Sequence, residues 1–552
     1  MKKGAKTKVA LLLIILLFTT IISSCTTNIE QPIEEIQEEE QNYTPVQGGT
    51  LSLSIFTPSH LNPIINQEED SYHVMKLIYE SLISLDENYR AKGVLAEEWI
   101  VQNNGESIIF NLRKDVTWHD DEPFTAKDVE FTLDVLKDKD VDSPYTQYIN
   151  KITDYNIIDD YKIEISFSNS QSGNLEAFIF PVLPAHRYKK PKDVMSAHKW
   201  SPIGTGPYEL NKYEQGKEIL LKLNGSYWGN IPYIENIHVK IRSKKEEIVK
   251  SFETKDVDLL RAIDREWNRF DEDEQLSIHP YITQKYNFIA VNHNNELFKN
   301  VNIRKAIQLA LNRQEMLGEI YLNQGEVVDV PISPNSWLYD KQLKLNSYNL
   351  EEAKKLIAES GLDAKADIEE GQEEDEDKNK KDNKDKKDKV KLEFDLIVNK
   401  NNGLRKQESK MVKKYIEAIG IDVNIEELPL DEINEKIAEK EFDAIITGWE
   451  LSYVPDLYFA FHSSEIKEGM NFISYNNKNM NKLLVEASKY KEEQERKKIY
   501  SELQTKISQD LPYINLYYTT SALIVNNRIK GPINPTDYNL FNNIEEWFIE
   551  YE

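Results

Sequence analysis

The chain has 552 residues, of which 40% are hydrophobic, and its formal net charge is −27. A chain of this length is expected to form two or three domains. Its acidic surface repels phosphate backbones, so the composition argues against nucleic-acid binding. The sequence contains one cysteine, Cys25, which excludes a disulfide within the chain.

The first 24 residues have the pattern of a secretory signal. Four lysines within residues 1–10 precede an apolar run, residues 11–22, that is shorter than the roughly 20 residues needed to span a bilayer. Two serines then lead directly to Cys25. This junction resembles the bacterial lipoprotein signal, in which the cysteine thiol receives a diacylglyceryl group and becomes the mature N-terminus. The alternative is an unmodified cysteine in an uncleaved helix.

This resemblance implies an extracytoplasmic chain, lipid-anchored to the outer face of the cell membrane. Two acyl chains give stable anchoring, at about 0.8 kcal/mol per buried CH₂, whereas one chain is marginal. Removal of residues 1–24, which hold four lysines and no acids, takes the formal net charge from −27 to −31. Such a charge repels the anionic headgroups of a membrane, so the acyl chains on Cys25 are the expected contact with the membrane.

Two segments have too few apolar residues to form a core. Residues 25–47 are rich in Glu and are interrupted by Pro32 and Pro45, which predicts a flexible tether. Residues 364–389 are almost entirely charged or polar, which predicts a disordered surface insertion. A metal site among the acids of this insertion is the alternative, and the interleaved lysines disfavour it.

Helix and strand signals are mixed through the rest of the chain. Residues 49–56 and 392–398 alternate apolar and polar side chains, as half-buried strands do. Gly420 marks a predicted helix end, after which residues 421–425 resume a strand. This order of strand, helix and strand indicates an α/β fold. Two sets of apolar residues recur with helical spacing, namely Ile303, Ala306, Ile307, Ala310 and Leu311, and then Met411, Val412, Tyr415, Ile416 and Ile419.

A series of short motifs is spread over almost the whole chain. In chain order these motifs are G-G-T-L at 48–51, L-N-P at 61–63, L-A-E-E-W at 95–99, the block 109–120, P-F-T-A-K-D-V at 123–129, P-I-G-T-G-P-Y at 202–208, 224–228, R-K-A-I at 304–307, G-W at 448–449 and R-I-K-G at 528–531. The ordered series resembles the family 5 extracellular solute-binding proteins, which are dipeptide and oligopeptide receptors. Residues 462–477 and the pair Glu546 and Trp547 are most similar to the branch that takes longer peptides.

The resemblance implies an α/β fold of the periplasmic-binding-protein type, a two-lobed clamshell with mixed sheets, a hinge and a ligand cleft between the lobes. Lobe I would comprise residues 48–300 and 517–552, with a family-specific subdomain at about 83–199. Lobe II would comprise residues 301–516. The chain would be a monomer without a cofactor that delivers its ligand to the permease subunits of an ABC transporter.

A receptor for many peptides has to bind what all peptides share. An extended oligopeptide would pair its main-chain N–H and C=O groups with strand edges, while hydrated pockets take its side chains. Closure then requires a ligand that touches both lobes. The resemblance and the positions of the motifs give the expected ligand-binding residues, which are Trp449, Tyr453, Asp456, Asn471, Phe472, Asn292, Asn62 and Leu61.

One part of the expected site departs from the family pattern. Relatives often carry an aspartate after the G-W motif that pairs with the ligand's α-amine, whereas Ser452 and Val454 stand at those positions here. Glu450 or Asp456 could replace the missing acid. Asp456 could equally begin a helix over residues 457–461 as its cap.

Other functions find less support in the sequence. His119 to Glu122 could be drawn as a metal cluster, but a turn is preferred, in which Asp120 and Thr125 bind free backbone amides ahead of a helix that starts at 125–127. Residues 204–207 lack the lysine of a phosphate loop and predict a turn entering a strand. No hydrolase, zinc-protease or dinucleotide motif occurs, so an enzyme is not expected. Nickel complexes, haem, oligosaccharides and peptide pheromones remain alternative ligands.

Overall fold

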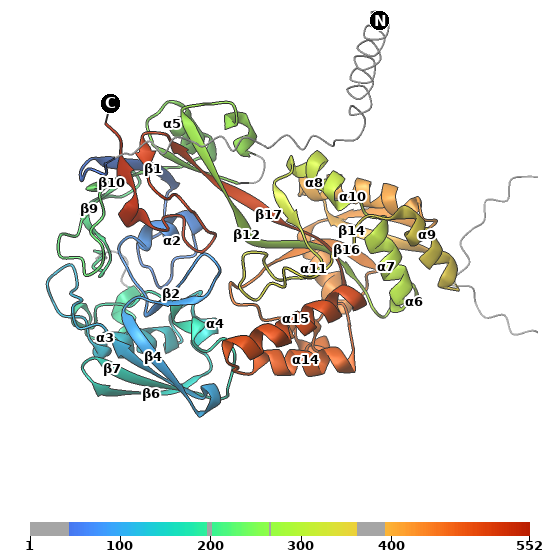
Figure 1. Cartoon of the computed structure of the whole chain (residues 1–552), viewed down its shortest axis with the longest axis horizontal. Coiled ribbons are helices and arrows are strands. Elements are labelled where there is room, and N and C mark those ends of the chain that lie inside the picture. The colour runs from blue at the N-terminus through green and yellow to red at the C-terminus, as the bar shows by residue number, and fades with distance from the viewer. Residues whose placement is uncertain (1–43, 196–200, 264–265, 362–391, 552) are drawn as a thin grey trace, which may run out of the picture. The chain divides into compact units, whose positions relative to one another are not determined.

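Two long antiparallel strands connect the buried cores of the fold, because each strand contributes side chains to more than one core (Figure 1). They are β12 (Leu276–Val291) and β17 (Tyr513–Asn526), and almost every residue of β17 is buried, as in a strand covered on both faces. The structure is a computed structural model that describes residues 44–195, 201–263, 266–361 and 392–551. The predicted signal, Cys25, most of the predicted tether and the 364–389 insertion lie outside the described residues.

A mixed sheet of eleven strands is built around this pair. Its order is β15, β14, β16, β12, β17, β11, β1, β10, β9, β8, and β13 also pairs with β17. The strands other than β12 and β17 are β1 (Thr50–Phe56), β8 (Tyr208–Glu214), β9 (Glu218–Leu223), β10 (Asn236–Arg242), β11 (Leu259–Ala262), β13 (Gly325–Val327), β14 (Glu393–Asn399), β15 (Asp422–Leu428) and β16 (Ala444–Glu450).

Buried side chains gather in two pairs of cores. The first pair holds side chains from residues 51–270 and 522–549, including those of α5 (Lys245–Glu253). The second pair holds side chains from residues 286–518. We call the chain around the first pair lobe I and the chain around the second pair lobe II.

Lobe I contains a second, antiparallel sheet in the order β4, β5, β7, β6, shown in blue and cyan in Figure 1. Alternate residues of its strands point into the core, as Phe110, Ile163 and Ile165 do. The helices and strands of lobe I not yet named are α2 (Glu69–Met75), β2 (Ile83–Leu85), β3 (Ala91–Gly93), β4 (Ala96–Gln102), β5 (Ser107–Leu112), α3 (Ala126–Lys137), α4 (Thr146–Ile149), β6 (Ile152–Asp159), β7 (Lys162–Phe167), β18 (Ile529–Lys530) and β19 (Phe548–Ile549).

Lobe II places helices around β14, β15 and β16. The parallel strands β14 and β15 are joined by α10, which forms the predicted strand–helix–strand unit. The helices of lobe II are α6 (Glu296–Lys299), α7 (Val301–Ala310), α8 (Arg313–Tyr321), α9 (Leu350–Glu359), α10 (Gly403–Glu417), α11 (Leu430–Glu439), α12 (Tyr458–Phe461), α13 (Glu465–Glu468), α14 (Lys478–Ser488) and α15 (Glu493–Asp510).

Several local predictions are confirmed by these elements. The strands expected at 49–56 and 392–398 are β1 and β14, and the two apolar helical faces belong to α7 and α10. Gly420 follows α10 with a φ of 85°, a left-handed conformation that favours glycine. Gly204 precedes β8 in a turn, where a Cβ would lie only 1.7 Å from the carbonyl oxygen of Ile78, so a side chain is excluded.

The predicted turn before α3 is present, but one of its contacts differs from the prediction. The amide of Trp118 donates to the carbonyl of Glu122 at 2.8 Å. Thr125 and Asp128 form a capping box at the start of α3, in which the Thr125 amide donates to the Asp128 carboxylate at 2.8 Å. Asp120 does not bind backbone amides, since its carboxylate lies 3.0 Å from the His186 ring nitrogen instead. His186 lies 66 residues further along the chain, so no local pattern predicted that it would return to this turn.

Candidate ligand-binding site

The expected binding segment follows β16, a strand in the middle of the large sheet. β16 pairs with β12, and Trp449 lies opposite Tyr286 in the register. The backbone amide of Leu451 continues the pairing by donating to the carbonyl of Gln284 at 3.0 Å. The chain then leaves the sheet, so Tyr453 and Asp456 lie in a loop beside the two long strands.

Trp449 lies in an aromatic cluster of lobe II. Its ring lies edge-on to Phe459 at 5.5 Å and to Phe472 at 5.9 Å between ring centres. Its Nε1–H donates to the Tyr513 hydroxyl at 3.2 Å. Trp449 and Phe472, two of the expected ligand contacts, therefore pack directly against each other. A ligand contact for either ring stays a prediction.

Tyr453 joins this loop of lobe II to lobe I. Its ring lies 5.3 Å from the ring of Tyr89 and 5.2 Å from that of Tyr538. Its hydroxyl donates to the backbone carbonyl of Asp537 at 3.1 Å. Among the eight expected residues, Tyr453 makes contacts that cross from one lobe to the other.

A small cavity of about 10 Å³ lies beside this loop, with room for about one water molecule. Ser452, Tyr453 and Asp456 line it together with residues of the long strands and of a second loop of lobe II. The side-chain atoms Gln284 Nε2 and Tyr518 Oη of those strands are buried and have no hydrogen-bond partner among the described residues. Buried polar atoms without a partner are rare in proteins and call for an explanation.

Tyr89 adds a third buried polar atom of this kind. Its hydroxyl lies near the side chains of Gln284, Ser333 and Asn335 but makes no hydrogen bond of good geometry with any described residue. Burial raises the pKa of Tyr89 and of Tyr518 above the ordinary tyrosine value. Both hydroxyls therefore keep their protons at neutral pH and can donate to an acceptor.

Asp456 binds a free backbone amide at the start of α12, although the N-cap position of that helix is Leu457 and not Asp456. Its carboxylate accepts a hydrogen bond from the backbone amide of Tyr458, the first residue of α12, at 2.9 Å. The side chain of Asp456 is otherwise exposed. An ionic contact between Asp456 and a ligand amine stays a prediction.

The three expected asparagines are buried and bind the backbone of their own lobe. Asn471 donates to the carbonyls of His462 and Tyr475, at 3.1 and 2.8 Å, and accepts from the amide of Tyr475. Asn292 donates to the carbonyls of Lys440 and Phe442 at 3.0 and 2.8 Å.

Asn62 in lobe I follows the same pattern, because it donates to the carbonyl of Val194 at 3.0 Å and accepts from the amide of Ile64. Its neighbour Leu61 is buried in the core of lobe I. The structure therefore gives these four residues contacts within the fold, and a role for any of them in ligand binding stays a prediction.

The sequence analysis missed Asp537, a largely buried carboxylate next to Tyr453. Burial, and next the negative charge of Glu69, raise the pKa of Asp537 to about 6. The carboxylate accepts from the backbone amide of Gln284 at 3.3 Å. No motif surrounds Asp537, and its proximity to Tyr453 depends on contact across 84 residues of sequence, so the sequence alone held no signal for it.

The two-lobed α/β fold, with its mixed sheets and strands shared between the lobes, is that of an extracytoplasmic solute-binding protein, as the sequence predicted. The family model of bacterial extracellular solute-binding proteins, family 5 (middle part), matches residues 90–468. This match spans more than half of the chain. The chain therefore belongs to family 5 of the bacterial extracellular solute-binding proteins.

Individual relatives agree with this assignment. The chain is 27% identical to the oligopeptide-binding protein AppA of Bacillus subtilis over 563 aligned residues, which cover 99% of each chain. The structure of that protein in complex with a nonapeptide matches 92% of this chain and 100% of its own, with a TM-score of 0.64. NikZ of Campylobacter jejuni in complex with Ni(L-His) matches 90% of this chain and 99% of its own, with 25% identity and a TM-score of 0.65.

Two features are absent from the described residues. No helix there is both long enough and apolar enough to cross a membrane. No group of three or more His, Cys, Asp or Glu side chains in the same residues is arranged to hold a metal ion.

Proposed function

We propose that this protein captures extended oligopeptides between its two lobes and delivers them to the permease of an ABC importer. The observation that carries the proposal is a set of three buried polar groups, Tyr89 Oη, Gln284 Nε2 and Tyr518 Oη, beside the loop that contains Tyr453. None of the three has a hydrogen-bond partner in the part of the chain that the structure describes. The amide and carbonyl groups of an extended main chain are partners of the kind these groups need. The likeness to AppA of Bacillus subtilis, solved with a nonapeptide, supports the same ligand class.

The proposal extends to the organisation of the chain. The division expected from the sequence places lobe I at residues 48–300 and 517–552, with a subdomain at about 83–199, and lobe II at residues 301–516. It differs from the cores described above, in which side chains of residues 286–298 and 517–518 pack in lobe II. The mature protein would be a monomer held to the outer face of the cell membrane by lipid on Cys25, and it would bind its ligand without chemical turnover. Metabolic labelling with a radioactive fatty acid tests the anchor, because Cys25→Ser should abolish the label.

Native mass spectrometry of the protein truncated after Cys25 and purified from cells tests the ligand class. We expect co-purified peptides, and isothermal titration calorimetry with the most abundant of them gives its affinity. Absence of peptides from the native protein, together with no binding of any oligopeptide from a mixed-length library, would contradict the proposal.

A nickel complex is the second candidate ligand, since NikZ, solved with Ni(L-His), matches this fold as well as AppA does. A peptide mass in the native spectrum favours the first candidate. A nickel adduct that a chelator removes favours the second.

A further inference from the structure

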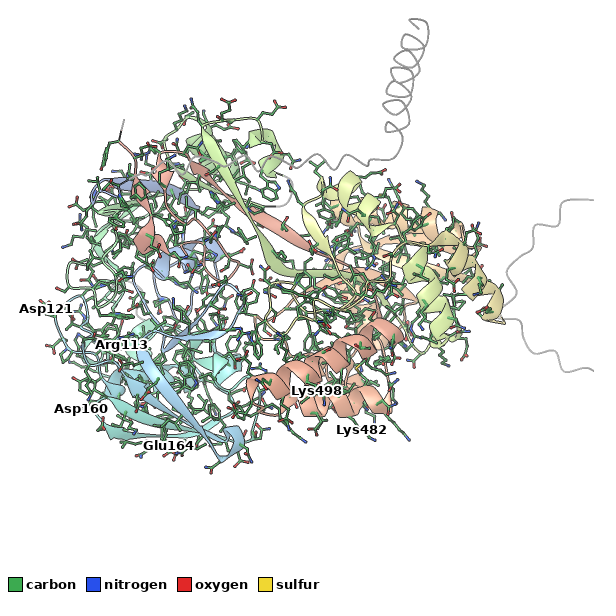
Figure 2. All side chains as sticks on the ribbon, viewed as in Figure 1. Arg113, Asp121, Asp160, Glu164, Lys482 and Lys498 are labelled. Atoms are coloured by element: carbon green, nitrogen blue, oxygen red, sulfur yellow. The ribbon has the colours of Figure 1, made fainter. Side chains whose placement is uncertain are left out.

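A cavity of about 460 Å³ lies within lobe I, and it shares no lining residue with the small cavity beside Tyr453. Ligand-binding pockets usually have volumes of about 300–1,000 Å³. Its walls come from α2, from the segment that includes Arg113 after β5, and from the C-terminal tail. Arg113 lies in the same part of the molecule as Glu164 of β7 and Asp160 of the turn between β6 and β7 (Figure 2).

The cavity has an aromatic lining. Rings that line it include those of Tyr72, Tyr145, Trp228 and Tyr538. The guanidinium of Arg113 covers the face of the Trp228 ring, 4.1 Å from its centre. A lining of this kind favours a flat, apolar molecule that can stack on rings.

Lys76 supplies an unusual positive charge to this cavity. It follows directly after α2, and its Nζ lies 3.0 Å from the centre of the Tyr538 ring and 4.9 Å from that of Tyr72. Lys76 is half-buried, and no hydrogen bond or ion pair connects its Nζ to any residue that the structure describes. Burial lowers the pKa of Lys76, and no acid lies close enough to oppose that effect.

Two buried arginines of the chain have acidic partners, whereas a third, Arg304, is held by backbone carbonyls. Arg313 lies 2.8 Å from Asp329, and Arg496 lies 2.7 Å from Glu176. A buried charge is costly unless an opposite charge or hydrogen bonds compensate it. Lys76 therefore lacks an anion that Arg313 and Arg496 possess.

The acids that line the cavity do not supply that anion. The carboxylate of Glu80 accepts three hydrogen bonds, from Thr205 at 2.8 Å and from Tyr227 and Trp228 at 2.9 Å each. Burial raises its pKa to about 7, although those hydrogen bonds oppose the rise. Asp86 accepts from two backbone amides of its own turn, and Glu87 and Glu545 also line the cavity without contacting Lys76.

We propose that the cavity of lobe I is a second binding site, for a small aromatic carboxylate whose carboxylate pairs with the Lys76 ammonium while its ring stacks on Tyr72, Tyr145 or Trp228. This site is separate from the proposed peptide site. The two are neighbours, because Tyr538 lines the large cavity and packs on Tyr453, which lines the small one.

Calorimetry of the mature chain in detergent with indole-3-acetate as the probe tests the site. The neutral isostere indole-3-acetamide should bind at least tenfold more weakly, because the charged hydrogen bond to Lys76 is lost. Lys76→Met should weaken indole-3-acetate binding by at least tenfold. Lys92→Met is the matched control, since Lys92 lines the same cavity but is exposed, and it should change the affinity by less than twofold.

A second measurement keeps the test independent of whether Lys76→Met folds. In the wild-type chain labelled with [ε-¹³C]lysine, one NMR signal, absent from Lys76→Arg, should titrate below the ordinary lysine range and move upward when indole-3-acetate is added. The proposal is overturned if indole-3-acetate does not bind, if acid and amide bind equally, or if no lysine signal responds to the probe.

Discussion

The guanidinium of Arg496 on α15 lies 2.7 Å from the carboxylate of Glu176 in a short turn of lobe I, and the two side chains are only 8% and 7% exposed. The pair therefore joins lobe II to lobe I through a desolvated contact. Nearby, the amide of Ser172 donates to the carbonyl of Ser488 at 2.9 Å. Figure 1 shows α14 and α15 beside the cyan segment of lobe I that carries these residues.

Removal of one partner from this pair should be strongly destabilising. Arg496→Met leaves the Glu176 carboxylate buried without its cation, which costs about 3–5 kcal/mol in comparable pairs. Arg90→Met is the control, because Arg90 forms an exposed pair with Glu493 that is worth about 1 kcal/mol or less. Urea unfolding monitored by tryptophan fluorescence gives both values. Equal losses in the two variants would count against the buried pair as a main contact between the lobes.

Asn471 should matter to stability more than its position in the expected site implies. Asn471→Ala removes three hydrogen bonds from a fully buried side chain and leaves backbone groups of His462 and Tyr475 unpaired. We expect a loss of about 2–4 kcal/mol in the free energy of unfolding.

Asn424→Ala is the matched control for this prediction, since the Asn424 amide makes an exposed bond to Asp395 and its loss should cost about 0.5 kcal/mol or less. If Asn471 acts only through these contacts within the fold, the peptide affinity of the folded fraction should be unchanged in Asn471→Ala. A weakened affinity without a change in stability would instead assign Asn471 to the ligand.

Asp537 should make stability depend on pH in a defined direction. Its pKa is about 6 in the folded chain against an ordinary value of 3.8, so the folded state holds the proton more tightly than the unfolded state. The stabilisation is complete below about pH 4 and is lost as the pH rises through 6, with an upper magnitude of about 3 kcal/mol.

Asp537→Asn cannot ionise, so relative to the wild type it should gain stability between pH 4 and pH 7.5. Urea unfolding of both proteins across this range isolates the contribution of Asp537, because all other groups are shared. Parallel pH profiles would show that the buried carboxylate does not titrate in this window.

Local structure followed from the sequence where the residues nearby determine it. β1, β14, α7 and α10 have the apolar periods that identified them, and Gly420 ends its helix because only glycine readily adopts that backbone. The large sheet could not be derived in the same way. Its order places β1 between β10 and β11, and such neighbours are chosen by packing across long distances in sequence.

The candidate site was predictable only in part, for the same physical reason. The resemblance located the loop after Trp449 but not the contacts of Tyr453. This residue contacts Tyr89, which lies hundreds of positions earlier in the sequence, and Asp537, which lies near the C-terminal end of the chain. Lys76 is a further example. A single lysine after a short helix carries no signal until the fold surrounds it with tyrosines and provides no acid.

Tyr518 provides a test in which stability and binding should change in opposite directions. Its hydroxyl is buried and has no partner among the described residues, so Tyr518→Phe should leave the free energy of unfolding unchanged or raise it by about 1 kcal/mol. If a bound peptide accepts a hydrogen bond from that hydroxyl, the same substitution should weaken peptide binding about tenfold.

Tyr513→Phe is the control, since the Tyr513 hydroxyl already accepts from Trp449, and its loss should cost stability and leave peptide affinity within about twofold. Calorimetry with a peptide co-purified from cells, combined with urea unfolding, measures both quantities. A Tyr518→Phe protein that binds peptide as the wild type does would remove this hydroxyl from the proposed contacts and leave its burial without a functional reason.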